Sequence, residues 1–132
     1  MKKEELITLA FKAADNAYAP YSKFHVGAAV ECKDGKVFIG ANIENSSFGA
    51  TVCAERNAIF AAYSNGYRKD DIIAMATVAD THGKLSYSCG LCRQVMGDLL
   101  NHDIPVYYAN RDQDVTMTVN DIYPYPFGPE DF

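Results

Sequence analysis

Two cysteine motifs constrain this chain more than any other feature. The first is Cys53-Ala54-Glu55, and the second is Cys89-Gly90-Leu91-Cys92. Zinc in proteins favours thiolate and imidazole ligands, and a catalytic zinc site uses three protein ligands while water takes the fourth position. Cys53, Cys89 and Cys92 supply three thiolates. The sequence therefore predicts a fold that brings the two motifs together around one metal ion.

Both motifs stand where helices are expected to begin. Cys89 and Cys92 are three residues apart, so on a helix they share one face. Exposed N–H groups and the positive end of a helix dipole favour anionic sulfur. Two helices that point their N-termini at one ion would thus hold three thiolates with little strain.

The residues that follow Cys53 suggest proton chemistry beside the metal. Glu55 follows a ligand by two positions, so its carboxylate could take a proton from a metal-bound water and pass it to a leaving group. Three thiolates on Zn²⁺ leave a formal charge of −1, which calls for a nearby cation. Arg56 is the nearest candidate because a guanidinium stays charged and donates several hydrogen bonds.

Apolar periodicity indicates an α/β chain. Spacings of three and four predict an amphipathic helix over residues 4–18, ended at Ala19-Pro20. Asp34-Gly35 separates two strand-like runs and indicates a hairpin with a type I′ turn. We expect strands over 26–32, 37–44, 72–79, 105–109 and 115–119, helices over 52–64 and 89–101, and a helical turn over 120–123. Strands that alternate with helices after a hairpin predict an α/β sandwich with a mixed sheet.

Asn42 and Glu44 lie two apart on the second expected strand, so their side chains should point to one face. An ordinary solvated strand face is one interpretation of this pair.

Bulk properties narrow the class of protein. The 132 residues fit one domain, 1–132, and a net charge of −5 leaves no basic footprint for nucleic acid. No apolar run approaches the roughly 20 residues of a membrane span. The first residues lack the pattern of a signal peptide, and four cysteines without such a signal favour free thiols or metal ligands. We therefore expect a cytoplasmic protein with no membrane or nucleic-acid partner.

The ordered motifs resemble the zinc-dependent cytidine deaminase family, specifically its small three-cysteine branch. Beside the two cysteine motifs, the resemblance is carried by Tyr21-Ser22-Lys23-Phe24-His25-Val26-Gly27-Ala28-Ala29, by Asn42-Ile43-Glu44-Asn45 and by Phe127-Gly128-Pro129-Glu130-Asp131. It covers nearly the whole chain. The resemblance implies a three-layer α/β/α sandwich with a mixed five-stranded sheet that opens with a helix and a β-hairpin.

The resemblance also implies an activity and a site. It implies hydrolytic deamination of cytidine and 2′-deoxycytidine to uridine and 2′-deoxyuridine in pyrimidine salvage. One Zn²⁺ per subunit would be held by three thiolates, with water or hydroxide in the fourth position, and Glu55 would move the protons. The substrate-binding residues it implies are Phe24, Asn42, Glu44, Ala54 and Phe127. Phe127 would act from a neighbouring subunit of a homotetramer with shared active sites.

Two positions depart from the family pattern. Ser88 stands where proline usually precedes the cysteine pair, and Phe48 stands where tyrosine is frequent. Serine is a favoured N-cap, so we expect Ser88 to cap the helix that carries Cys89 and Cys92.

Other interpretations of the same residues follow from simpler chemistry. Cys89 and Cys92 alone could form a redox pair or half of a structural zinc site, and a deaminase could act on another cytosine-bearing compound. Cys32, on an expected strand, fits a small core residue, with a fourth metal ligand as the alternative. Phe24 and Phe127 could serve in packing, and Arg56 could be a surface arginine. The histidines have no ligand spacing, so the expected ligand set is all sulfur.

Overall fold

A mixed five-stranded sheet forms the centre of the molecule in a computed structural model that describes residues 1–132. The strand order is β2-β1-β3-β4-β5. β3 and β4 run parallel, and the other neighbours are antiparallel. The strands are β1 (Val26–Cys32), β2 (Val37–Ala41), β3 (Ile72–Ala79), β4 (Pro105–Ala109) and β5 (Asp114–Thr118). The predicted mixed sheet is confirmed.

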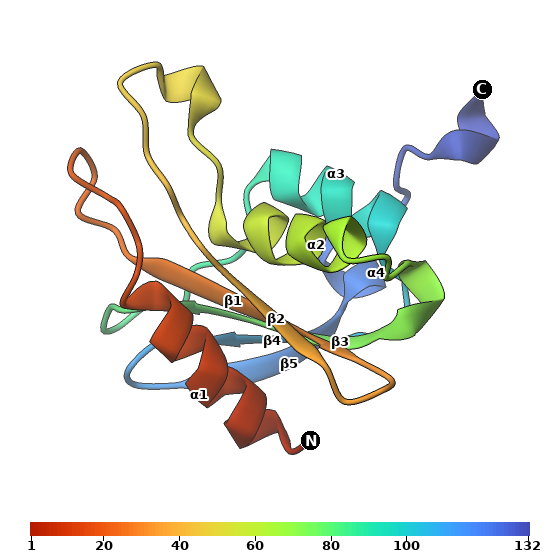
Figure 1. Ribbon diagram of the computed structural model, residues 1–132, viewed down its shortest axis with the longest axis horizontal. Coiled ribbons are helices and arrows are strands. Elements are labelled where there is room, and N and C mark those ends of the chain that lie inside the picture. The colour runs from red at the N-terminus through yellow and green to blue at the C-terminus, as the bar shows by residue number, and fades with distance from the viewer.

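Helices cover both faces of the sheet (Figure 1). The helices are α1 (Lys3–Ala14), α2 (Ala54–Ser64), α3 (Gly90–Leu99) and α4 (Val119–Ile122). α1 lies alone on one face, and the other three lie on the opposite face. The predicted three-layer sandwich is therefore correct. None of these helices has the length and apolarity needed to span a bilayer.

The alternation of side chains along β1 divides the core into two parts. Ala28 and Val30 point to the layer that contains α2 and α3, while Ala29 points to α1. Successive residues of a strand face opposite sides, so one short strand contributes to both cores. Burial on both faces also explains the nearly continuous apolar run in β3.

Two glycines allow the helices to approach the sheet closely. A Cβ on Gly27 would lie 1.9 Å from the Ala10 carbonyl oxygen of α1. A Cβ on Gly40 would lie 2.5 Å from the Ala58 backbone nitrogen of α2. Both distances are shorter than van der Waals contact, so these positions exclude any side chain. The position of Gly40 helps to set the depth of α2, the helix that follows Cys53.

Two predicted element ends and the predicted type of the hairpin turn were wrong. α1 ends at Ala14 instead of residue 18, because Tyr18 turns away to form a bridge with Ile43. β2 ends at Ala41 instead of residue 44, and Ile43 then bridges both Tyr18 and Val52. The hairpin turn is not type I′, since Gly35 alone has positive φ (93°) and Asp34 does not.

Candidate active site

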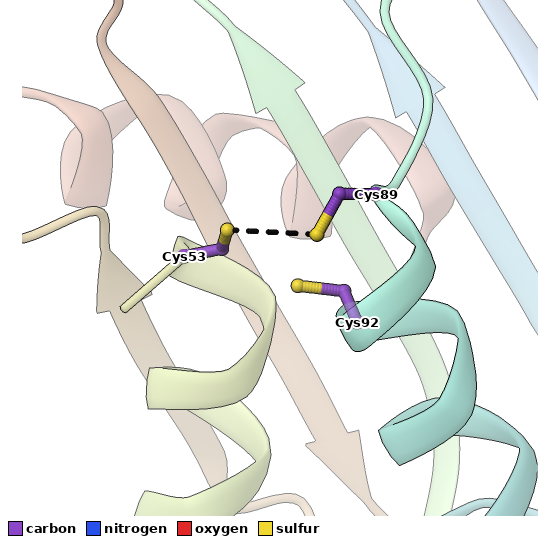
Figure 2. A group of neighbouring side chains, drawn as sticks. All are labelled: Cys53, Cys89 and Cys92. Carbon is purple, nitrogen blue, oxygen red and sulfur yellow. Dashed lines mark hydrogen bonds between the residues drawn. The ribbon is translucent and has the colours of Figure 1, made fainter. Parts of the chain in front are cut away.

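The three predicted ligand cysteines come together at the adjacent ends of α2 and α3 (Figure 2). Cys53 is the N-cap of α2 and Cys89 is the N-cap of α3, while Cys92 lies in the first turn of α3. Their sulfur atoms all lie within 4.8 Å of one another. Thus two helix N-termini converge on one point, as the spacing of the motifs predicted.

The sulfur geometry fits a tetrahedral metal ion. The Sγ atoms of Cys53 and Cys89 are 3.8 Å apart. Two sulfurs bound at about 2.3 Å with tetrahedral angles would be separated by about 3.8 Å. Cys32, the last residue of β1, is fully buried in the core and is not part of this cluster. The cluster therefore has the three-ligand form of a site that keeps one coordination position for water.

The electrostatics of the cluster favour anionic sulfur. Hydrogen bonding with Cys92 and with Arg56 lowers the pKa of Cys53 to about 5. The hydrogen bond with Cys53, together with burial, raises the pKa of Cys92. Burial opposes the charge of Arg56, yet its contacts with Cys53 and Cys92 raise the pKa of the guanidinium. The interpretation of Arg56 as a solvated surface residue does not fit this position.

Glu55 lies in the first turn of α2 and is only 4% exposed. Burial raises the pKa of its carboxyl group, and the nearby Cys53 acts in the same direction. A carboxylate with a raised pKa in a cavity wall takes up a proton more readily than a free one, as a group that accepts and passes on protons must. Glu55 therefore has the environment expected of a proton carrier instead of a surface glutamate.

A cavity of about 290 Å³ opens beside Glu55 and the two N-cap cysteines. Its volume is close to the lower end for small-molecule sites. Six of the predicted site residues line it, namely Phe24, Asn42, Glu44, Cys53, Glu55 and Cys89. The remaining lining residues are Ser22, Val26, Thr51, Thr77, Val78, Ala79, Ser86 and Tyr87.

Asn42 and Glu44 both reach the cavity although β2 has already ended. The Asn42 amide accepts a hydrogen bond from the Val26 N–H (2.9 Å) and donates one to the Phe24 carbonyl (2.7 Å). The Glu44 carboxylate accepts hydrogen bonds from the backbone N–H groups of Tyr21 and Ser22 and from the Ser22 hydroxyl. The hydrogen bond from that hydroxyl is the main cause of the lowered pKa of Glu44. The two polar side chains thus fix the loop that holds Phe24 against the cavity.

Two predicted substrate-binding residues lie away from the cavity within this chain. Ala54 is fully buried and does not line the cavity. Phe127 is 57% exposed in the C-terminal tail, where its ring stacks on Phe132 and its carbonyl accepts a hydrogen bond from Gln94. This tail projects beyond α3 (Figure 1).

The prediction for Ser88 was wrong. Cys89 occupies the N-cap position, and the Ser88 hydroxyl instead bonds the Tyr108 hydroxyl at 2.7 Å inside the protein. The chain turns into α3 one residue later than expected, which directs the serine toward the sheet. Phe48, the second departure, is 75% exposed and lies edge-on to Tyr21.

Several residues that line the cavity were not predicted from the sequence. Thr77 is a polar residue in the otherwise apolar β3 run, and its buried hydroxyl has no hydrogen-bond partner. A threonine within an otherwise apolar strand was the one sequence signal that could have indicated Thr77 as a cavity residue. Ser86 and Tyr87 lie in the loop before α3, where the sequence gives no comparable signal.

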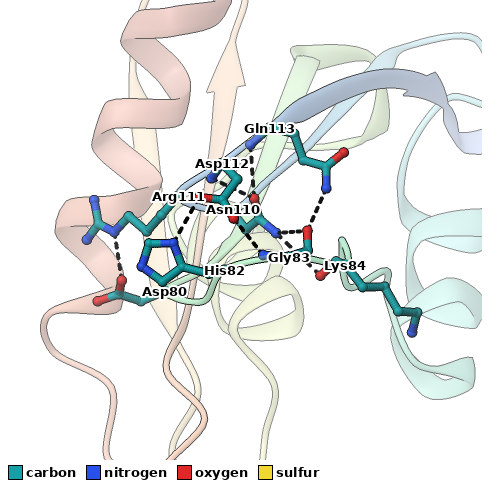
Figure 3. Close-up of polar contacts among 8 residues, drawn as sticks. All are labelled: Asp80, His82, Gly83, Lys84, Asn110, Arg111, Asp112 and Gln113. Atoms are coloured by element: carbon teal, nitrogen blue, oxygen red, sulfur yellow. Dashed lines mark hydrogen bonds and ion pairs between the residues drawn. The ribbon is translucent and has the colours of Figure 1, made fainter.

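The loop before α3 is held by the turn between β4 and β5 (Figure 3). The buried Asn110 side chain donates hydrogen bonds to the carbonyls of Gly83 and Lys84 and accepts from two N–H groups of its own turn. Asp112 adds contacts to His82 and the Gly83 N–H. These contacts anchor the segment that leads to Cys89.

Comparisons with known proteins agree with this geometry. Residues 1–107 match the family model of the cytidine and deoxycytidylate deaminase zinc-binding region. A cytidine deaminase of Halalkalibacterium halodurans is 49% identical, over 99% of this chain and 98% of that protein. One from Sporosarcina psychrophila is 47% identical, over 99% and 95%.

Solved structures give the same result. The crystal structure of cytidine deaminase from Burkholderia pseudomallei is similar with a TM-score of 0.92 and 44% identity, over 96% of this chain and all of that one. Cytidine deaminase from Mycobacterium tuberculosis has a TM-score of 0.80 at 35% identity, over 97% and 98%. With a family match over most of its length and full-length relatives near half identity, this chain belongs to the cytidine deaminase family of hydrolases.

Proposed function

We propose that this chain hydrolyses the C4 amino group of cytidine and 2′-deoxycytidine, giving uridine or 2′-deoxyuridine and ammonia in pyrimidine salvage. The observation that carries the proposal is the position of buried Glu55 in a cavity wall formed partly by Cys53 and Cys89. Relatives that span nearly the full chain are cytidine deaminases. The domain proposed to carry the activity is the whole of residues 1–132.

Cys53, Cys89 and Cys92 would hold one Zn²⁺ ion, since their sulfurs have the spacing of a tetrahedral site. Bound there, zinc would supply a Lewis acid that lowers the pKa of a water in the fourth position. Arg56 would offset the charge of the three thiolates through its contact with Cys53.

Glu55 is the proposed proton carrier. Its carboxylate would take one proton from the attacking water and deliver it to the ring nitrogen, and would then take the second proton of that water and pass it to the departing amino group. One water is consumed, the C4–N bond breaks, and ammonia leaves. The buried position of Glu55 keeps these transfers out of bulk solvent.

Asn42 and Glu44 are proposed to hydrogen-bond the sugar hydroxyls, while Phe24 packs on the nucleoside and the backbone of Ala54 meets the base. Both polar residues are held rigidly by the loop that contains Phe24, so their acceptor atoms are already oriented. The Glu44 carboxylate would repel a phosphate at the sugar. Nucleosides are therefore the proposed substrates in preference to nucleotides.

Phe127 is proposed to complete the cavity of a neighbouring subunit in a homotetramer. The support is its exposed ring in a projecting tail and the large exposed side chains of Phe48 and Leu91. Phe127→Ala should raise KM, whereas Tyr125→Ala in the same tail should not. A fully active monomer in solution would contradict this arrangement.

Four free cysteines support a reducing cytoplasmic location.

One assay tests the reaction. Zinc-loaded protein is mixed with cytidine, and the ultraviolet change that accompanies uridine formation is followed with and without a chelator. Glu55→Gln should lower kcat by about 100-fold or more while zinc content is retained. Glu4→Gln, an exposed glutamate of α1, is the matched control. A zinc-loaded protein that converts no cytosine nucleoside would refute the proposed reaction, and full activity of Glu55→Gln would refute the role of Glu55.

A further inference from the structure

Tyr87 places an aromatic ring in the wall of the candidate active-site cavity. It lines this cavity together with Phe24, and these two are the only aromatic side chains that do so. Tyr87 is 46% exposed, so much of its ring faces open space instead of protein. An aromatic ring exposed in a cavity offers a surface against which a planar base can pack. The reaction proposed above uses Phe24 but gives no part to Tyr87.

The ring of Tyr87 is supported from behind by the sheet. Its centroid lies 5.1 Å from that of Tyr108, and the two ring planes meet at 60°, which is an edge-to-face contact. Tyr108 lies on β4 and is completely buried. Ser88, the next residue, is fixed as well: its hydroxyl bonds the Tyr108 hydroxyl at 2.7 Å, and its carbonyl accepts a hydrogen bond from Arg93 Nε at 2.7 Å. The Tyr87 ring therefore forms a rigid part of the wall.

The chain places Tyr87 at the cysteine end of the cavity. Cys89, the N-cap of α3, follows it by two residues and belongs to the cysteine cluster. Two residues span at most about 7 Å, so Tyr87 lies near the point where the base would react. Asn42 and Glu44, the proposed sugar contacts, come from the segment after β2. Tyr87 is thus positioned to meet the base instead of the sugar.

The chemistry of the base indicates which of its edges faces Tyr87. C4 of cytosine is flanked by the ring nitrogen N3 on one side and by C5 on the other. Cys53 at the start of α2 and Cys89 at the start of α3 lie on opposite sides of the cysteine cluster (Figure 2). Glu55, the proposed proton carrier for N3, lies in the first turn of α2, so the N3 flank faces that helix. The C5 flank then faces the start of α3, where Tyr87 lies.

We propose that Tyr87 is a specificity-determining residue that packs against the C5 edge of the base and excludes substituents there. The inference rests on the proposed deaminase function and narrows its substrate class to cytosine nucleosides that carry hydrogen at C5. A methyl group at C5 would require the Tyr87 ring to move, and the contact with buried Tyr108 opposes that movement.

The test is a competition between two nucleosides. The full zinc-loaded protein receives cytidine and 5-methylcytidine in one mixture, and chromatography follows uridine and 5-methyluridine. The ratio of the two kcat/KM values does not depend on the amount of active protein, so partial unfolding of a variant cannot imitate the result. Tyr87→Ala should raise the ratio of 5-methylcytidine to cytidine by about tenfold, because one methyl group in an apolar contact discriminates by roughly that factor. Tyr87→Phe keeps the ring and should leave the ratio within twofold of wild type.

Two controls separate a contact with the base from a general disturbance. Competition between cytidine and 2′-deoxycytidine should change by less than twofold in Tyr87→Ala, because the sugar lies away from this ring. Tyr125→Ala removes a tyrosine that is 98% exposed in the C-terminal tail, and it should leave both ratios unchanged. Calorimetric binding of uridine and 5-methyluridine gives the same comparison without turnover, and Tyr87→Ala should shift it toward 5-methyluridine.

An unchanged ratio of 5-methylcytidine to cytidine in Tyr87→Ala would overturn the proposal for Tyr87. An equal rise in Tyr125→Ala would do the same, as would a wild-type protein that accepts 5-methylcytidine as readily as cytidine. A wild-type protein that converts neither nucleoside would refute the proposed function itself, before any variant is compared.

Discussion

Arg56 donates a hydrogen bond from its Nη2 to the Sγ of Cys53 across 3.7 Å. Cys53 caps α2 and Arg56 lies in the first turn of the same helix, so the contact is set by local helical geometry. The Nε of Arg56 is buried without a hydrogen-bond partner. The guanidinium is therefore held at the cysteine cluster even though its own hydrogen bonding is incomplete.

This contact predicts that Arg56→Gln weakens zinc binding. Three thiolates and Zn²⁺ carry a formal charge of −1, and glutamine cannot offset it. We expect about tenfold weaker binding, equivalent to roughly 1.4 kcal/mol, measured by competition with a chromogenic chelator. Lys12→Gln removes one positive charge from an exposed position on α1 and should leave zinc affinity unchanged. Unchanged affinity together with an unchanged pH–rate profile in Arg56→Gln would exclude the charge-compensating role.

Glu55 should destabilise the metal-free protein at neutral pH. Its folded-state pKa is raised by burial, so the folded state holds its proton at pH values where the unfolded state has lost it. Stability from this group is complete below the unfolded pKa of about 4.3 and is lost as pH rises through the folded pKa. Metal-free Glu55→Gln should therefore unfold at a higher temperature than wild type near pH 7.

The pH dependence of the unfolding midpoints tests the same explanation for Glu55. The difference in unfolding midpoint between Glu55→Gln and wild type should shrink toward zero as pH falls to about 4, where both states of wild type hold the proton. Glu4→Gln, on the exposed side of α1, should show no such pH-dependent gain. An equal or lower midpoint for Glu55→Gln at neutral pH would show that burying this carboxylate carries no cost.

Gly27→Ala should destabilise the packing of α1 on the sheet. The new Cβ would lie 1.9 Å from the Ala10 carbonyl oxygen, so the helix must move outward. Overpacking of this kind costs about 1–3 kcal/mol, or more where backbone must shift. Urea denaturation measures the loss. Gly49→Ala is the matched control, because nothing lies within 4 Å of its Cβ position; an equal loss there would refute the steric explanation.

Asn110→Ala should loosen the loop that leads to Cys89 (Figure 3). The substitution removes the side-chain donor of the Lys84 carbonyl and one of the two donors of the Gly83 carbonyl, which keeps its hydrogen bond from Gln113. We expect a loss of about 1–3 kcal/mol in the free energy of unfolding, with lower kcat because Ser88 and Cys89 follow this loop. Asn120→Ala, at an exposed position, should change neither quantity. Wild-type stability and kcat in Asn110→Ala would show that the loop needs no such anchor.

Much of the fold and of the site could be predicted because it depends on local pattern. Apolar spacing predicted the helices and strands, since each element has its own period of burial. The three ligand cysteines and Glu55 were predicted from spacing within two short motifs, each placed at a helix start. Boundaries were less predictable: Tyr18 fits the helical pattern, yet it leaves α1 because pairing with Ile43 satisfies its backbone better.

The sequence alone placed the three cysteines and Glu55 at two helix starts, because residue type and spacing define both motifs. Only the tertiary structure decided where the Ser88 side chain lies. Ser88 was expected to cap α3, but its hydroxyl turns inward to Tyr108, a strand residue twenty positions away. No local pattern encodes that contact, since it depends on where α3 meets the parallel pair β3 and β4. Contacts between elements distant in sequence arise from packing, and packing exists only in the folded chain.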